Sequence, residues 1–147
     1  MKILYYILPL LAGILMTVQS GINSQLRSAI QHPILAALIS FLSGTAALIV
    51  MVMLSKQAIP TMQTFGGISW YKWTGGLLGA FIVTVSLVSV SRIGAANMFV
   101  LIIAGQLTTA VIIDHFGMLG LQQSTITIQK MIGVLLLVSG VYLVTKK

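Results

Sequence analysis

The sequence predicts an all-α integral membrane protein in which five transmembrane helices account for nearly all of the 147 residues. Two observations lead to this fold class. Hydrophobic residues make up 58% of the chain and charged residues only 6%, whereas an average soluble domain has about 25% charged residues. Five apolar stretches are also long enough to cross a hydrocarbon core, which takes about 20 helical residues. Because a spanning segment must satisfy its own backbone hydrogen bonds, these stretches are expected to be helices.

The helices are expected to form a single domain over residues 1–147. Pro9 lies in the first third of the first helix, where it is expected to introduce a kink. Trp70 and Trp73 flank Lys72 just before the third helix, a pattern more typical of an interfacial anchor than of ligand stacking. Asp114 ends the fourth helix. In chain order, the expected boundaries are about 3–23, 33–54, 73–91, 94–113 and 125–145.

The first helix also has some features of a signal peptide. Lys2 precedes an apolar run, and Val18-Gln19-Ser20 loosely resembles a cleavage site. The uncharged stretch from Ile3 to Leu26 is longer than a typical signal-peptide core, however. We therefore interpret it as a spanning helix.

Basic residues are scattered between the apolar runs. The net charge of +7 does not predict nucleic-acid binding, because that function requires basic residues clustered on one face. Isolated Lys and Arg residues instead mark helix ends, where their charged heads reach the lipid headgroups. If the N-terminus is cytoplasmic, one side of the membrane carries four basic residues, Lys2, Lys56, Lys72 and Lys130. The opposite side also carries four, Arg27, Arg92, Lys146 and Lys147.

The equal number of basic residues on the two sides affects the orientation of the chain in the membrane, because the Lys/Arg bias of short loops sets how a helical protein inserts. An equal count predicts dual topology, with copies inserted both ways. The alternative is that an uncounted feature, such as the α-amino group, tips the balance to one orientation.

Polar amides lie at membrane depth, where leaving an amide unpaired costs several kcal/mol on apolar-transfer scales. Gln19 and Asn23 are four residues apart and share a helix face, which Arg27 would extend if the helix continues. This pair is expected to line an aqueous or ligand cavity. Gln106 lies in the middle of the fourth helix, and Asn97 is expected to point the opposite way. For these two residues, hydrogen bonding between helices and substrate binding both remain open.

Small residues form stripes that let helices pack closely in lipid. Gly44 belongs to such a stripe on the second helix, Gly75 and Gly79 to one on the third, and Gly105 precedes Gln106 on the fourth. Stripes of this kind indicate a compact bundle, not a particular function. We therefore predict only packing roles for these glycines.

The ionisable residues exclude several chemistries. Asp114 is the only acid and adjoins His115 at the membrane boundary, where capping or pairing with a Lys is the simplest interpretation. No ionisable residue lies at the middle of a span, so a proton-coupled mechanism with a central carboxylate is not expected. The chain has no cysteine and no set of nucleophile, base and orienting acid. We therefore expect no enzymatic activity, no metal and no cofactor.

Several motifs together resemble one family. In chain order they are QSGINSQL at 19–26, SFLSGTAAL at 40–48, GGLLGA at 75–80, RIGAA at 92–96, and GQ at 105–106 followed by DHFG at 114–117. This set is similar to the YdcZ-like family, the five-helix branch of the drug/metabolite transporter superfamily. The resemblance covers nearly the whole chain. It implies a half-transporter of the bacterial cytoplasmic (inner) membrane that pairs with itself as an antiparallel homodimer.

The motif positions supply candidate residues, although the resemblance assigns them no roles. Those expected to face a substrate are Gln19, Asn23, Ser40, Asn97 and Gln106. Those expected near the gates are Arg27, Arg92, Asp114 and His115. The expected partners are membrane lipids, a second copy of the chain and a small-molecule substrate that the sequence does not identify.

The leading hypothesis is therefore a small-molecule transporter that works by alternating access, with the binding site at the interface of inverted repeats. Two copies in opposite orientations would supply those repeats. A neutral or anionic solute is favoured over proton-driven cation export. The competing hypotheses are a non-transporting membrane scaffold, in which the amides only bond helices together, and one half of a heterodimeric transporter.

Overall fold

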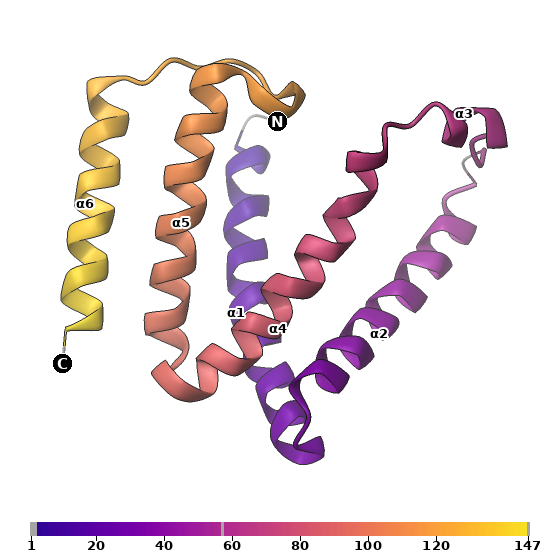
Figure 1. Ribbon diagram of the computed structural model, residues 1–147, viewed down its shortest axis with the longest axis horizontal. Helices are drawn as coiled ribbons and strands as arrows, with labels where there is room; N and C mark the ends of the chain where they lie inside the picture. The colour runs from indigo at the N-terminus through magenta and orange to yellow at the C-terminus, as the bar shows by residue number, and fades with distance from the viewer. Residues whose placement is uncertain (1–2, 57, 147) are drawn as a thin grey trace. The chain divides into compact units, whose positions relative to one another are not determined.

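The described part of the chain is all-helical. The computed structural model describes residues 3–56 and 58–146 (Figure 1). Five helical segments are long and apolar enough to cross a membrane, as the composition predicted. Lys2 and Lys147, which count in the charge balance, lie outside the described residues.

The elements follow one another with short connections. Two 3₁₀ helices, η1 and η2, and the short helix α3 lie in the connections, and η1 runs directly into α4. In chain order the elements are α1 (Leu4–Ile30), α2 (Pro33–Leu54), α3 (Met62–Gly66), η1 (Trp70–Thr74), α4 (Gly75–Ile93), α5 (Ala95–Phe116), η2 (Met118–Gly120) and α6 (Ile128–Thr145).

Three helix boundaries differ by three or more residues from those expected. Asp114 does not end its helix, because α5 continues to Phe116 and is capped by Gly117. α1 continues past Asn23 to Ile30, and Gln31 ends it in the left-handed conformation at φ 54°. α6 begins only at Ile128, because Thr127 is its N-cap and accepts a hydrogen bond from the Lys130 amide at 3.3 Å. The helix that carries Gln19 and Asn23 therefore carries Arg27 as well.

The described chain divides into two compact units, one up to Ser91 and one from Arg92 onward. In the first unit, α1 packs against α2. Ala36, Ala37 and Leu87 form its buried core, which thus joins α2 to α4. Leu26, Ile30 and Val83 pack against this core. The two alanines have small side chains, which lets helix backbones approach closely.

The predicted small-residue positions differ in their surroundings. A Cβ added to Gly79 would lie 3.5 Å from the Phe41 ring, so this glycine of α4 lies against α2. Around Gly44, Gly75 and Gly105, an added Cβ would meet no atom within 4 Å in the described part of the chain. Of these four glycines, Gly79 thus has a close partner in another helix of its own unit.

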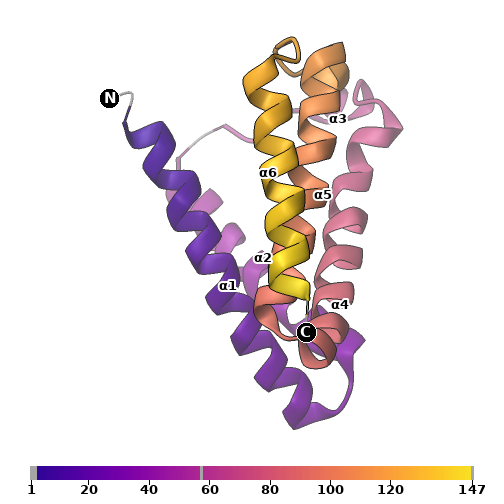
Figure 2. The same ribbon diagram turned by 90° about the vertical axis from the view of Figure 1, so that its left-hand side faces the viewer.

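The second unit consists of α5, α6 and their connection. α5 and α6 lie side by side and run in opposite directions (Figures 1 and 2). Gly117 ends α5 in the left-handed conformation at φ 60°, with its amide bonded to the last carbonyls of the helix. The start of α5 and the end of α6 consequently lie at the same end of this unit.

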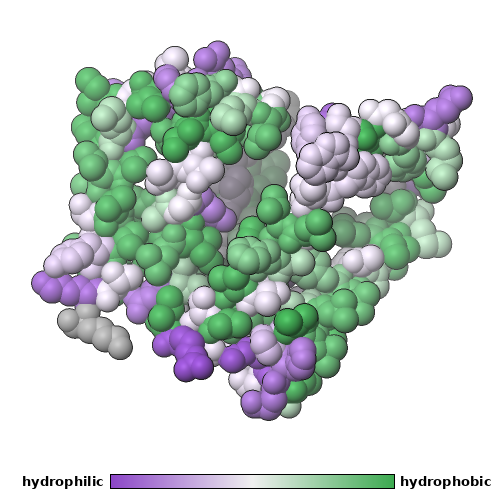
Figure 3. Space-filling view, in the orientation of Figure 1, coloured by the Kyte–Doolittle hydropathy of each residue, from purple (hydrophilic) through white to green (hydrophobic). Residues whose placement is uncertain are grey.

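Apolar side chains cover most of the surface. Hydrophobic residues dominate the face shown in Figure 3, and hydrophilic residues gather near helix ends. Among the described residues, the buried hydrophobic side chains are only Ala36, Ala37, Leu87 and Met98. A chain in water could not leave so much apolar surface exposed. The apolar surface is therefore suited to lipid or to another copy of the chain.

Candidate functional site

A hydrogen bond joins two of the predicted site residues. Asn23 of α1 is 7% exposed, the one buried polar residue in the described part of the chain. Its Nδ2 donates to Ser40 Oγ of α2 at 3.1 Å. Ser40 is held in turn by Ser43, whose Oγ donates to the Ser40 carbonyl at 2.9 Å. The two motifs that carry Asn23 and Ser40 thus meet at the α1–α2 contact.

Asn23 belongs to a polar face of α1. Residues four apart in an α-helix differ in direction by only about 40°, so Gln19, Asn23 and Arg27 project from neighbouring positions around α1. On the same side, Ser20 Oγ and Arg27 Nε are buried without a hydrogen-bond partner in the described structure. Leaving such a donor unpaired costs about 1–3 kcal/mol. We call Gln19, Ser20, Asn23 and Arg27 the polar face of α1.

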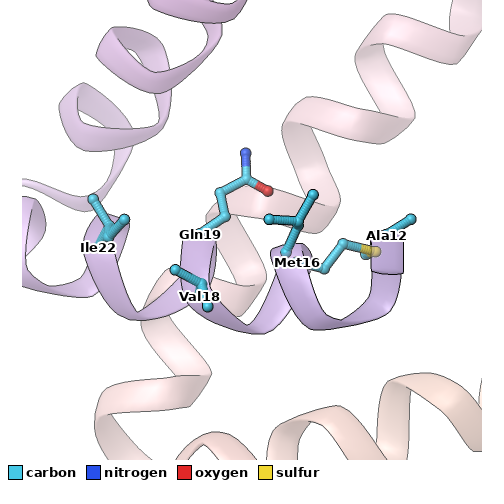
Figure 4. Close-up of a pocket in the computed structure, with 6 residues that line it drawn as sticks. Ala12, Met16, Val18, Gln19 and Ile22 are labelled. Atoms are coloured by element: carbon cyan, nitrogen blue, oxygen red, sulfur yellow. The ribbon is translucent and has the colours of Figure 1, made fainter. Parts of the chain in front are cut away.

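Gln19 lies at the edge of an open hollow of about 450 Å³. Its carboxamide extends away from α1, with Met16 and Ile22 along the helix on either side (Figure 4). Gln19 is the polar member of the lining, which is otherwise formed by Ala12, Leu15, Met16, Val18 and Ile22. The lining comes from α1 alone and the hollow is open, so a second element would have to cover it before it could enclose a small molecule.

The other two predicted amides lie in the second unit. Asn97 is half-buried near the start of α5, and its Nδ2 donates to the Ile93 carbonyl at 2.9 Å. Gln106 is exposed and forms no hydrogen bond within the described residues. The Asn97 amide thus bonds to the backbone just before α5. The Gln106 amide is free to contact another molecule or a second copy of the chain.

The Asp114-His115-Phe116-Gly117 motif holds the connection between α5 and α6. The Asp114 carbonyl accepts a hydrogen bond from the Ser124 amide at 2.8 Å. His115 Nδ1 accepts from the Ile126 amide at 3.3 Å, and the His115 carbonyl accepts from Gln123 Nε2 at 3.0 Å. These bonds fold the connection back onto the end of α5.

Asp114 does not pair with a lysine in the described part of the chain, contrary to the simplest interpretation of the sequence. Lys130 Nζ donates instead to Ser124 Oγ at 2.8 Å, and to the Ser124 and Thr125 carbonyls at 3.2 and 3.3 Å. Lys130 of α6 therefore stabilises the connection between α5 and α6. Its ammonium group is not extended toward the lipid headgroups. Sequence reasoning missed these contacts, because backbone carbonyls carry no sequence signal.

Replacing Gly117 with Ala is expected to destabilise the protein by about 1–2 kcal/mol, because the left-handed conformation costs a residue with a Cβ about that much. The new Cβ would also lie 3.3 Å from Gln123 Cβ. Thermal unfolding in detergent measures the effect. Gly133→Ala in α6, where nothing lies within 4 Å, is the matched control and should be neutral or slightly stabilising. Equal melting temperatures for the Gly117→Ala variant and the unmodified protein would contradict this account of the connection.

The fold and the site define a polytopic integral membrane protein with a polar face on its first helix. The family model described as "Putative inner membrane exporter, YdcZ" matches residues 4–143, and the chain belongs to this family. It is 27% identical to the inner membrane protein YdcZ of Escherichia coli (strain K12) over 137 residues, which cover 92% of this chain and 91% of that protein. No solved structure matches the chain.

These comparisons place the chain in the inner membrane as a multi-pass protein. They support a role in membrane transport, because the matching family is described as one of inner membrane exporters. The resemblance inferred from the ordered motifs is thus confirmed over nearly the whole chain.

Proposed function

We propose that the chain is half of a small-molecule transporter, which two copies complete as an antiparallel homodimer. Inverted-repeat carriers bind their substrate near the midplane, at the interface between the repeats, and expose it to each side in turn. Two copies inserted in opposite orientations supply such repeats. The equal count of four basic residues on each side supports this arrangement.

The polar face of α1 is the observation that carries the proposal. Within the described residues, Arg27 Nε and Ser20 Oγ are buried without hydrogen-bond partners, and Gln19 borders the hollow on α1. Gln19, Asn23 and Ser40 form the substrate-facing part of the site, and Gln106 joins them in the assembled dimer. Arg27, Asp114 and His115 lie near the ends of their helices, where the gates of the transporter open and close.

The substrate is a neutral or anionic solute. Asp114 is the only acidic residue of the chain and lies in the last turn of α5. Cation carriers generally depend on an ionisable group within the membrane, and the polar face of α1 offers amides, a hydroxyl and a guanidinium instead. These groups suit hydrogen-bond acceptors and anions.

One observation favours a second candidate, a membrane scaffold without transport activity. The Asn23–Ser40 hydrogen bond joins two helices of the same chain, as amides do when they only hold a bundle together. A scaffold of this kind would use the Asn23 motif for packing alone.

Flux measurements in liposomes separate the two candidates. Purified protein is reconstituted, and uptake of a panel of radiolabelled neutral and anionic small solutes is compared with uptake by protein-free liposomes. The transporter proposal predicts saturable, protein-dependent uptake of at least one class of solute. Uptake equal to that of empty liposomes across the whole panel would favour the scaffold.

A further inference from the structure

A second hollow lies at one end of the second unit. It has a volume of about 270 Å³. Its lining comes from the start of α5, the end of α6 and the last residues of α4. Its lining residues are Arg92, Ile93, Asn97, Leu101 and Thr145. The candidate spans Ala95–Phe116 and Ile128–Thr145 begin and end here, so the hollow lies at the boundary of the hydrocarbon layer.

The hollow has an unneutralised positive charge. Arg92 is exposed and forms no ion pair or hydrogen bond with the described residues. The only acid of the whole chain, Asp114, lies at the far end of α5, about 30 Å away at 1.5 Å per residue. Asp114 therefore cannot neutralise Arg92, and within the described residues its guanidinium is open to an anion from outside the chain.

Two further features favour an oxyanion. Asn97 uses one of its two amide hydrogens on the Ile93 carbonyl, which leaves the other available as a donor. Gly94 precedes α5 at φ 80° and provides no capping side chain, so the positive end of the helix dipole is uncovered. The guanidinium, the amide and the helix terminus all attract phosphate oxygens, and the planar guanidinium can bind two of them at once.

Beyond Arg92 and Asn97, the lining offers no further hydrogen-bond donor to a ligand. Leu101 lies in the second turn of α5, deeper in the membrane than Asn97, and Ile93 is also apolar. The Thr145 hydroxyl donates to the Val141 carbonyl at 2.7 Å and so has no hydrogen to offer a ligand. A free inorganic ion would gain nothing from this apolar part. An amphiphile with an anionic head and an acyl chain fits both parts.

We propose that Arg92 and Asn97 bind the phosphate group of an anionic phospholipid in this hollow. The glycerol and the first part of an acyl chain lie against Leu101 and Ile93. Basic pockets between transmembrane helices are known to recognise anionic headgroups in this way. Arg92 and Asn97 thereby serve lipid recognition, and this role does not depend on the transported solute.

Native mass spectrometry of the purified protein in detergent tests this site. Phosphatidylglycerol is titrated against phosphatidylcholine, which carries no net charge. The protein is expected to bind phosphatidylglycerol at least tenfold more tightly, and Arg92→Gln is expected to remove about that factor, since a hydrogen bond to a charged group is lost. Arg92→Lys should keep part of the preference, because charge remains but two-point binding does not. Lys72→Gln, which removes one charge at another helix end, is the matched control and should change nothing.

Asn97→Asp provides a second variant of nearly the same size. Its carboxylate should repel phosphate and abolish the preference for phosphatidylglycerol even though Arg92 is present.

Inorganic phosphate added in competition with the lipid identifies the source of the anion. Displacement of the lipid only at high phosphate concentration supports the phospholipid assignment. Displacement at phosphate concentrations comparable to those of the lipid would overturn that assignment. An undiminished preference in Arg92→Gln, or equal binding of the two lipids, would overturn the site itself.

Discussion

Replacing Gln19 with Ala is expected to lower solute flux in liposomes at least tenfold without changing the thermal stability of the protein. Gln19 is exposed and forms no hydrogen bond within the described residues, so the fold of the single chain does not depend on its amide. In the proposed transporter, this amide is expected to contact the solute next to Asn23. Loss of one or two hydrogen bonds from a site shielded from water costs about 1–3 kcal/mol, which corresponds to about 5- to 150-fold in rate, with a loss above tenfold expected when both bonds are lost.

The matched control is Gln129→Ala, which removes an exposed amide from the first turn of α6. This variant should retain full flux. Asn23→Ala should differ from Gln19→Ala in its effect on stability. It breaks the hydrogen bond to Ser40 and should therefore lower both flux and thermal stability. Unchanged flux in Gln19→Ala, together with a purely structural defect in Asn23→Ala, would show that these amides only hold helices together.

Shifting the charge balance is expected to abolish transport by forcing every copy into one orientation. Ser28 and Ala29 are exposed in the last turn of α1, beside Arg27. Changing both to Lys raises the count on their side of the membrane from four to six, against four on the other side. Since the Lys/Arg bias sets insertion, copies of this variant should all insert the same way. Without inverted copies, flux should fall at least tenfold.

A complementary variant provides the control. Gln122 and Gln129 are exposed on the opposite side, in the connection before α6 and at the start of that helix. Changing both to Lys should fix the other orientation and also abolish flux. When the two variants are produced together, the inverted pair forms again and flux should return. Full flux from either variant alone would contradict the antiparallel arrangement.

The helices could be predicted from sequence where an uninterrupted apolar run is long enough to cross the membrane. Each apolar run became a candidate span, and α2 has the expected boundaries, because Pro33 starts the helix and His32 caps it. The end of α1 was not predictable in this way. The polar residues after Ile22 resembled a helix end, but Asn23 is buried against α2 and the backbone remains helical as far as Ile30. Hydropathy measures transfer into lipid and does not detect a polar helix segment that packs against another helix.

The candidate site was predictable only within a single helix. Helical periodicity placed Asn23 and Arg27 on one face of α1, and the structure shows Arg27 in the same helix. The contact between Asn23 and Ser40 was not predictable, because it depends on how closely α1 and α2 approach. His115 shows the same limit. Its residue type suggested a role at a gate, but its ring nitrogen accepts a hydrogen bond from a backbone amide that spacing alone could not identify.

The orientation of single copies in the inner membrane is the most direct test of the proposed transporter. The chain has no cysteine, so single cysteines can be introduced at Ala95 and at Gln122, two exposed positions on opposite sides, without changing the charge count. A membrane-impermeant maleimide is then added to intact spheroplasts. We predict that each variant reacts to about half of its total and completes its reaction only after the membrane is opened. Complete labelling of one variant and none of the other would contradict the account.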